Sequence, residues 1–183
     1  MFKKRLGLEK LNARKLCVLA MLTALTVLLA VYGTFRIGNM IKIPTKFVTV
    51  FIAAALYGPI WGGVVAALGD LLNAFLVPVG PWLPQITAVE FLYGFIFGLF
   101  FFTEHAKTYE KNYLLRTILC ALTLTFIDIF PMSWILTTVG YFPSVGAAIV
   151  LRIYASVIKL ALYIVVCLLL KRYLKSFERL IHK

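Results

Sequence analysis

Long apolar runs alternate along this chain with short polar or Pro/Gly-rich segments. Six of these runs predict helices, over residues 16–35, 47–57, 60–77, 86–103, 114–139 and 145–170. Most are close to the roughly 20 residues that a helix needs to cross a bilayer, whereas the second is too short by that rule. The Gly58-Pro59 pair separates the second run from the third, and Pro131 predicts a kink in the fifth. The pattern therefore predicts an all-α membrane protein with six transmembrane helices in a single integral membrane domain.

The distribution of charge predicts how this domain is oriented. Hydrophobic residues make up 62% of the chain, and the formal net charge is +12. The Lys and Arg residues gather in residues 1–15, in residues 104–116 and in residues 172–183, which flank the bundle of residues 16–171. Cytoplasmic segments of membrane proteins carry such an excess of positive charge. We therefore expect both termini in the cytoplasm and a multi-pass protein of a bacterial-type plasma membrane. We expect the lipid bilayer, and no nucleic acid, as the partner of these charges.

Signals for other classes of protein are weak. The basic N-terminal segment precedes a long apolar run without a small-residue cleavage pattern, so we do not expect a cleaved signal peptide. Cys17, Cys120 and Cys167 show no metal-ligand spacing, and we predict no metal and no cofactor. The chain has no Gly-rich nucleotide-binding loop, and His105 and His182 lie in polar segments away from any nucleophile on the same face. We therefore do not expect an enzyme.

Two cations lie inside the last apolar run. Arg152, Ser156, Lys159 and Tyr163 follow at i, i+4, i+7 and i+11, which places them on one helical stripe. A charged side chain near the middle of a bilayer costs about 2.5–3.5 kcal/mol on insertion scales, so it faces a partner or a cavity. Two interpretations stay open: the cations bind a ligand, or they neutralise the acids in other apolar runs, which are Asp70, Glu90 and Asp128.

The predicted outer loop of residues 36–46 also carries positive charge, from Arg36, Lys42 and Lys46. Positive residues outside depart from the topology rule, and departures of this kind favour a functional role. The alternative is that these side chains reach the outer lipid headgroups.

Several short motifs occur in a characteristic order in the first half of the chain. They are Arg36-Ile37-Gly38, the segment from Leu56 to Gly63 (LYGPIWGG), Asp70 in a helix of small residues, the segment from Pro78 to Thr87 (PVGPWLPQIT), and the Gly94…Gly98 pair. In this order the chain resembles the substrate-binding S-components of energy-coupling factor (ECF) vitamin importers, most closely the folate group. The resemblance covers about residues 36–102, and the flanking helices match by topology.

The resemblance implies a high-affinity vitamin-binding membrane subunit with no transport activity alone. It also implies two kinds of partner, a transmembrane coupling subunit and two cytoplasmic ATPases, in which ATP hydrolysis would take place. Family members carry an Ala-x-x-x-Ala motif on the first helix that contacts the coupling subunit, and Ala20 and Ala24 match it. Small residues one turn apart also favour close helix packing on physical grounds.

Two features depart from the folate group and leave the substrate open. Gln85-Ile86 replaces a Gly-Phe pair, and Glu90 stands where an acid is unusual. A carboxylate can accept paired hydrogen bonds from a pterin, but it also suits an aminopyrimidine. Folate is the prediction, pantothenate and hydroxymethylpyrimidine are alternatives, and a proton-coupled carrier with Asp70, Glu90 and Asp128 as relay is a rival. The predicted substrate-binding residues are Arg36, Lys46, Trp82, Gln85, Glu90, Arg152 and Lys159, with Phe142 as a further apolar surface.

Overall fold

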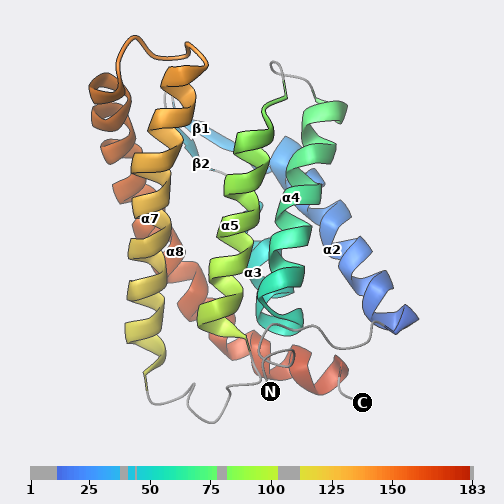
Figure 1. The fold of residues 1–183 in the computed structure, drawn as a ribbon. Coiled ribbons are helices and arrows are strands. Elements are labelled where there is room, and N and C mark those ends of the chain that lie inside the picture. Colours follow the sequence, from blue (N-terminus) through green and yellow to red (C-terminus); the bar gives the residue numbers. More distant parts are fainter. Residues whose placement is uncertain (1–11, 38–40, 44, 78–81, 103–111, 182–183) are drawn as a thin grey trace.

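A computed structural model describes residues 12–37, 41–43, 45–77, 82–102 and 112–181 of the 183-residue chain. Six helices and one short β-hairpin make up this part of the structure (Figure 1). Their bounds are α2 (Ala13–Tyr32), β1 (Phe35–Ile37), β2 (Ile41–Ile43), α3 (Phe47–Tyr57), α4 (Pro59–Leu76), α5 (Pro84–Phe101), α7 (Tyr113–Thr138) and α8 (Val145–Ile181).

The predicted helical membrane fold is confirmed. Five helices are long and apolar enough to cross a membrane, and α3, with 11 residues, is a shorter apolar helix. The bounds of α3 agree with the prediction, because Gly58 has a φ of 98° and Pro59 begins the next helix. A positive φ is accessible to glycine at no steric cost, whereas a helix cannot continue through it.

The prediction of a loop over residues 36–46 was wrong for residues 36–37 and 41–43, which lie in strands. Strands β1 and β2 pair antiparallel there, with Arg36 opposite Lys42. The sequence signal was the alternation Phe-Arg-Ile and Ile-Lys-Ile, which has the period of two that is typical of strands. Each segment has only three residues, so the surrounding apolar runs obscured it.

The last helix is longer than predicted. Loss of apolar character placed its end near Leu170, but α8 continues to Ile181. No glycine or proline occurs between Ala147 and Ile181, so nothing in the local sequence breaks the helix. A helix ends where its backbone is interrupted, and leaving the apolar layer does not interrupt it.

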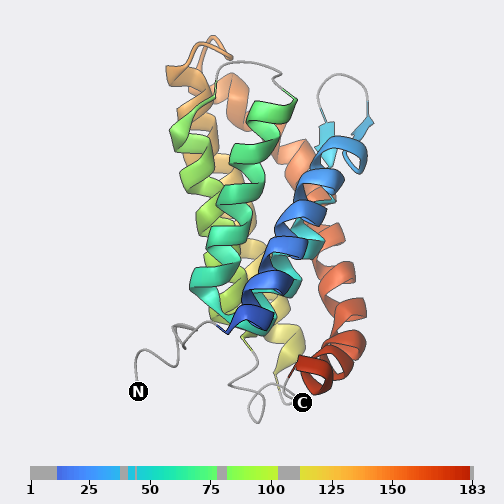
Figure 2. The same ribbon diagram turned by 90° about the vertical axis from the view of Figure 1, so that its right-hand side faces the viewer.

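The two ends of the bundle carry different connections (Figures 1 and 2). The hairpin, the end of α4, the start of α5, the end of α7 and the start of α8 lie at one end, called here the hairpin end. The start of α2, the turn between α3 and α4, and the end of α8 lie at the opposite end. An up-and-down path of this kind agrees with the predicted six-span topology.

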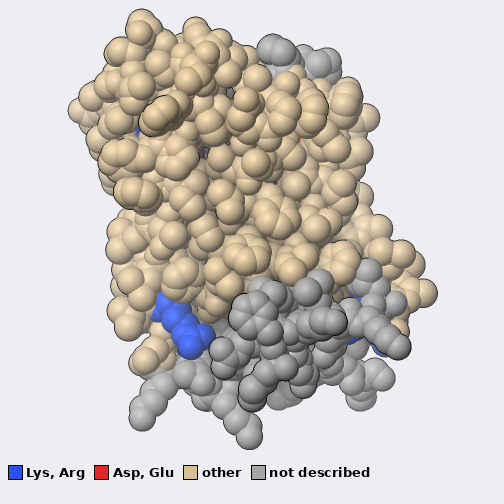
Figure 3. All heavy atoms as spheres, in the orientation of Figure 1, with Lys and Arg blue, Asp and Glu red and all other residues tan. Residues whose placement is uncertain are grey.

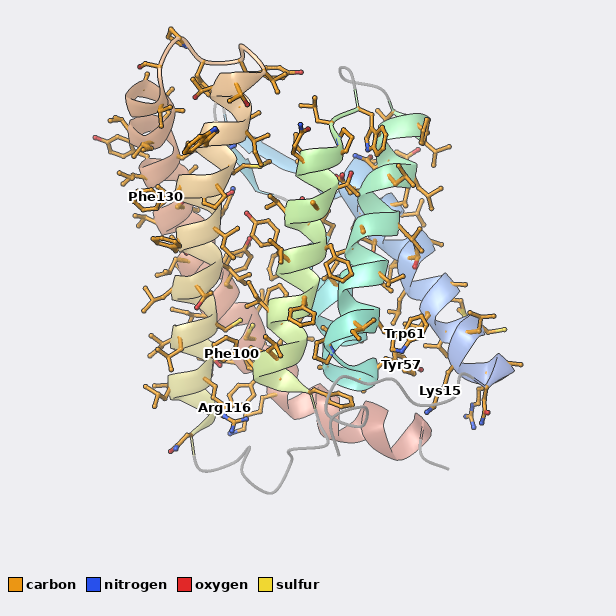
Figure 4. All side chains as sticks on the ribbon, in the orientation of Figure 1. Lys15, Tyr57, Trp61, Phe100, Arg116 and Phe130 are labelled. Carbon is orange, nitrogen blue, oxygen red and sulfur yellow. The ribbon has the colours of Figure 1, made fainter. Side chains whose placement is uncertain are left out.

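The outer surface of the bundle is apolar. Figure 3 shows one face on which Lys and Arg side chains gather at the end opposite the hairpin, while most of the remaining atoms belong to uncharged residues. Large side chains such as Met21, Phe130, Trp134 and Tyr154 are exposed, and Phe130 points away from the bundle in Figure 4. So much exposed apolar surface is expected where lipid, not water, surrounds the protein. The chain is thus a multi-pass membrane protein.

Helices α4 and α5 pack more closely than any side chain would allow. A Cβ atom on Gly94 would collide with the backbone of Gly62 and Gly63, and one on Gly98 would collide with the backbone of Pro59. Backbone atoms cannot yield as a flexible side chain can. The small residues of α4 and α5 therefore fix the contact that holds Asp70 and Glu90 near each other.

The close α4–α5 contact predicts a strong effect of a single methyl group. Gly94→Ala should lower the free energy of unfolding by about 1–3 kcal/mol, because the helices must separate to admit the Cβ. Thermal unfolding in detergent measures the change. Gly146→Ala is the matched control, since a Cβ at Gly146 has nothing within 4 Å. Equal unfolding temperatures for the two variants would contradict the packing described here.

Candidate functional site

A cavity of about 260 Å³ lies among the helices. All six helices contribute to its wall, and Glu90 and Arg152 lie about two turns from the starts of α5 and α8, toward the hairpin end. The lining residues are Ala30, Thr34, Lys46, Phe47, Val50, Asn73, Glu90, Tyr93, Phe97, Leu124, Asp128, Met132, Arg152, Lys159 and Tyr163. A mainly apolar and aromatic wall with a few polar groups is typical of small-molecule sites.

The first charged group at the cavity is centred on Lys46. Its Nζ lies 2.8 Å from Glu90 Oε1 and 3.6 Å from Asp70 Oδ1. Thr87 Oγ1 donates a hydrogen bond of 2.9 Å to Asp70 Oδ2, and so fixes the second oxygen of that carboxylate. We call Lys46, Asp70 and Glu90 the Lys46 cluster.

The electrostatic balance keeps Lys46 charged. Lys46 precedes α3 and lies outside the spanning helices. Burial by itself lowers the pKa of Lys46, but the carboxylates of Glu90 and Asp70 outweigh burial and raise the pKa above its ordinary value. The side chain is therefore cationic at neutral pH.

The second charged group is centred on Asp128 of α7. Arg152 Nη1 lies 3.1 Å from Asp128 Oδ1 and also donates to the Asp128 backbone carbonyl at 3.0 Å. Lys159 Nζ lies 2.8 Å from Asp128 Oδ2, and the Ser156 hydroxyl donates to the same oxygen at 3.1 Å. We call Asp128, Arg152 and Lys159 the Asp128 cluster.

The charged side chains of both clusters are largely shielded from solvent. Their exposed fractions lie between 13% and 17%. Ion pairs on a protein surface contribute little because water and salt screen them, but that screening is weak here. The charges of both clusters therefore act strongly on one another and on whatever enters the cavity.

The structure brings four of the seven predicted substrate-binding residues to one cavity: Lys46, Glu90, Arg152 and Lys159. Arg36 lies on β1 at the hairpin end. Trp82, Gln85 and Phe142 do not line the cavity, and Trp82 instead donates to Thr87 Oγ1 at 3.0 Å and stacks on Phe75. A ligand contact for Arg36, Trp82, Gln85 or Phe142 stays a prediction.

Several residues of the cavity were not among the predicted substrate-binding residues. Asp128 was considered as a counter-ion or as part of a proton relay, and the signal for its place here was that an acid in an apolar run must find a cation. Tyr93 lies three residues after Glu90, on the same face of α5, and this spacing was the available signal. Tyr163 was placed on the stripe of α8, and its ring packs edge-on against Phe47 with the centroids 4.9 Å apart.

The structure also bears on the alternative roles proposed for the charged residues. Both cations of α8 contact Asp128, so the counter-ion interpretation describes their contacts in this structure. The three acids of the possible proton relay are divided between the two clusters. His105 and His182 lie outside the described residues.

Comparisons with known proteins relate the chain to transporter components. The family model "ECF transporter, substrate-specific component" matches residues 14–172. Folate transporter FolT of Leuconostoc mesenteroides is 33% identical over 101 residues, which are 54% of this chain and 52% of that protein. FolT of Clostridium novyi is 32% identical over 89 residues (46% and 51%), and FolT of Streptococcus mutans is 28% identical over 116 residues (63% and 62%). The chain thus spans about half to three fifths of the length of these relatives.

The fold agrees with that placement. The crystal structure of FolT bound with folic acid superposes with a TM-score of 0.75 at 23% identity, over 87% of this chain and 93% of that one. At this identity the likeness shows the fold alone. The match of the family model over most of the chain shows that this protein belongs to the substrate-specific components of ECF transporters.

Proposed function

We propose that this protein is the folate-binding subunit of an ECF-type importer. The observation that carries the proposal is the shielded cavity with two charged clusters inside an otherwise apolar bundle. Arg152 and Lys159 suit the carboxylates of folate, and Glu90 suits the N–H groups of its ring. The rings of Phe47, Tyr93, Phe97 and Tyr163 offer flat apolar walls. The similarity to three FolT proteins supports the same substrate.

Another vitamin, pantothenate, and a vitamin precursor, hydroxymethylpyrimidine, are alternatives for the same role. Pantothenate would use the cations but has no ring for the aromatic walls, and hydroxymethylpyrimidine would use Glu90 but has no carboxylate for Arg152. Equilibrium binding to the purified protein separates the three. We expect folic acid to bind most tightly and an excess of either alternative to leave its binding unchanged. Tight binding of an alternative, with no binding of folic acid, would reassign the substrate.

A proton-coupled carrier is less well supported. Asp70 and Glu90 are both held by Lys46, while Asp128 is held by two other cations. Acids tied to separate cations form no continuous path for a proton. Uptake by proteoliposomes that contain this protein alone, driven by an imposed proton gradient, would establish the carrier.

Transport then requires partners. We propose a transmembrane coupling subunit and two cytoplasmic ATPases, with this chain in a bacterial-type plasma membrane and both termini in the cytoplasm. Ala20 and Ala24 are exposed on α2, away from the cavity wall. Two alanines one helical turn apart leave a flat strip against which a partner helix can lie.

The docking role predicts a separation of binding from transport. Replacing Ala20 and Ala24 together with Trp should abolish uptake by cells that contain the whole importer and should change folic acid affinity by less than about three-fold, because the bulk disturbs only the partner contact. Ala161→Trp, at another exposed alanine on α8, is the control and should leave uptake intact. Parallel loss of binding and uptake would mean that this face packs within the protein.

A further inference from the structure

The two charged clusters belong to two different groups of helices. The Lys46 cluster comes from the start of α3 and from α4 and α5, and the Asp128 cluster comes from α7 and α8. Each ion pair at the cavity joins residues of the same cluster. Among the described residues at the cavity, one polar contact joins the two groups of helices: the Tyr93 hydroxyl of α5 donates to Asp128 Oδ1 at 3.3 Å. A ligand in the cavity therefore lies between two polar groups that hardly touch each other.

The two clusters carry opposite net charge. The Lys46 cluster has one cation and two carboxylates, a formal charge of −1. The Asp128 cluster has two cations and one carboxylate, a formal charge of +1. Where screening is weak, this arrangement favours a ligand that is rich in hydrogen-bond donors at one end and anionic at the other.

The hydrogen bonds within the clusters show which atoms remain available. Asp128 receives four side-chain contacts, from Arg152 and Tyr93 on Oδ1 and from Lys159 and Ser156 on Oδ2. A carboxylate has about four acceptor sites, so Asp128 is filled. Glu90 differs: Oε1 accepts from Lys46, whereas Oε2 has no hydrogen-bond partner among the described side chains.

A side chain with unused donors lines the same cavity from the other group of helices. Arg152 lines the cavity, and its buried Nε has no hydrogen-bond partner in the described part of the chain, while Nη1 is held by Asp128. Buried donors in proteins are nearly always paired, so the unpaired Nε leaves this guanidinium short of an acceptor. Asp128 thus holds one side of the guanidinium through Nη1.

Resting on the proposed folate function, we propose that the ligand lies across the cavity, with the donor groups of its ring on Glu90 Oε2 and its carboxylate end on the guanidinium of Arg152. In this orientation the ligand joins the helix group α3–α5 to the pair α7–α8. Asp128 supports the arginine and does not contact the ligand. Glu90 and Arg152 therefore determine specificity at opposite ends of one molecule.

In the proposed orientation each variant loses one contact with the ligand. Ligands that lack the group at that contact can therefore identify which contact was lost. Binding is measured with folic acid, with its dimethyl ester, which has no free carboxylate, and with 2-desaminofolic acid, which lacks the ring amino group. Arg152→Lys keeps the charge and loses the guanidinium donors that Asp128 does not hold. Its affinity for folic acid and the desamino compound should fall about 10- to 100-fold, with less than about three-fold change for the dimethyl ester.

Glu90→Gln should give the opposite pattern. We expect a loss of about 10- to 100-fold for folic acid and the dimethyl ester, and little change for the desamino compound, because the lost partner is then already absent. Lys46 keeps Asp70 as its partner in this variant. Arg116→Lys is the control for the arginine change, since Arg116 lies on α7 near the end opposite the hairpin (Figure 4) and should affect no ligand.

The possible failures are distinguishable. If the wild-type protein does not bind folic acid, the proposed function is wrong. If it binds folic acid but Arg152→Lys shows the pattern expected for Glu90→Gln and the reverse, the ligand lies in the opposite orientation and the inference is overturned. If each folded variant loses affinity for all three ligands equally, or for none of them, Glu90 and Arg152 do not bind separate ends of the ligand and the inference is overturned.

Discussion

Replacing Asp128 with alanine is expected to lower the free energy of unfolding by about 3–5 kcal/mol. The carboxylate accepts from Arg152 and Lys159, and both cations are shielded from solvent. Without it, two buried positive charges face each other across a cavity with weak screening. Removing one partner of a buried ion pair costs more than the pair itself contributes, because an uncompensated charge remains. Thermal unfolding of the purified protein in detergent measures the loss.

A double substitution separates this charge effect from a simple packing effect. Asp128→Asn together with Lys159→Gln removes one charge of each sign and preserves the size of both side chains. We expect the double variant to unfold at a higher temperature than Asp128→Asn alone, since fewer unpaired cations remain. An Asp128→Ala protein as stable as the wild type would show that the Asp128 cluster does not stabilise the bundle.

Removing a cation from α8 is expected to have the largest effect on ligand affinity. Arg152→Gln and Lys159→Gln should each weaken folic acid binding by about 2–5 kcal/mol, which is about 30- to 5,000-fold, because a buried charged partner of the ligand is lost. Equilibrium binding to purified, folded variants provides the measurement. Lys171→Gln is the control on the same helix, since Lys171 lies over the ring of Tyr113 at 5.0 Å and not at the cavity. Wild-type affinity in folded Arg152 and Lys159 variants would exclude a binding role for this stripe.

Much of the architecture followed from local sequence patterns. Apolar runs predicted the helices, and Gly58-Pro59 predicted where α3 ends and α4 begins. Both features depend on neighbouring residues alone. The hairpin and the full length of α8 were missed for a related reason. A three-residue strand between long apolar runs gives a weak signal, and the end of an apolar run is not the end of a helix.

The pairing within the site could not be predicted in the same way. The sequence showed three acids in apolar runs, two cations on the last helix and a further cation at Lys46. Which acid contacts which cation depends on how each helix is rotated about its axis. That rotation follows from close contacts such as the one between Gly62 and Gly94. The structure divides the charges into two clusters of opposite sign, a division that no spacing within a single helix contains.

The proposed function requires that the cavity holds folate. The most direct test is mass spectrometry of small molecules that remain bound when the protein is extracted in mild detergent from cells supplied with folate, pantothenate and hydroxymethylpyrimidine. We expect a folate in near-stoichiometric amount with the wild-type protein, and a much smaller amount with Arg152→Gln purified in parallel. A stoichiometric amount of pantothenate or hydroxymethylpyrimidine in place of folate would contradict the folate assignment. Equal amounts of folate in both preparations would contradict the role of Arg152 in binding it.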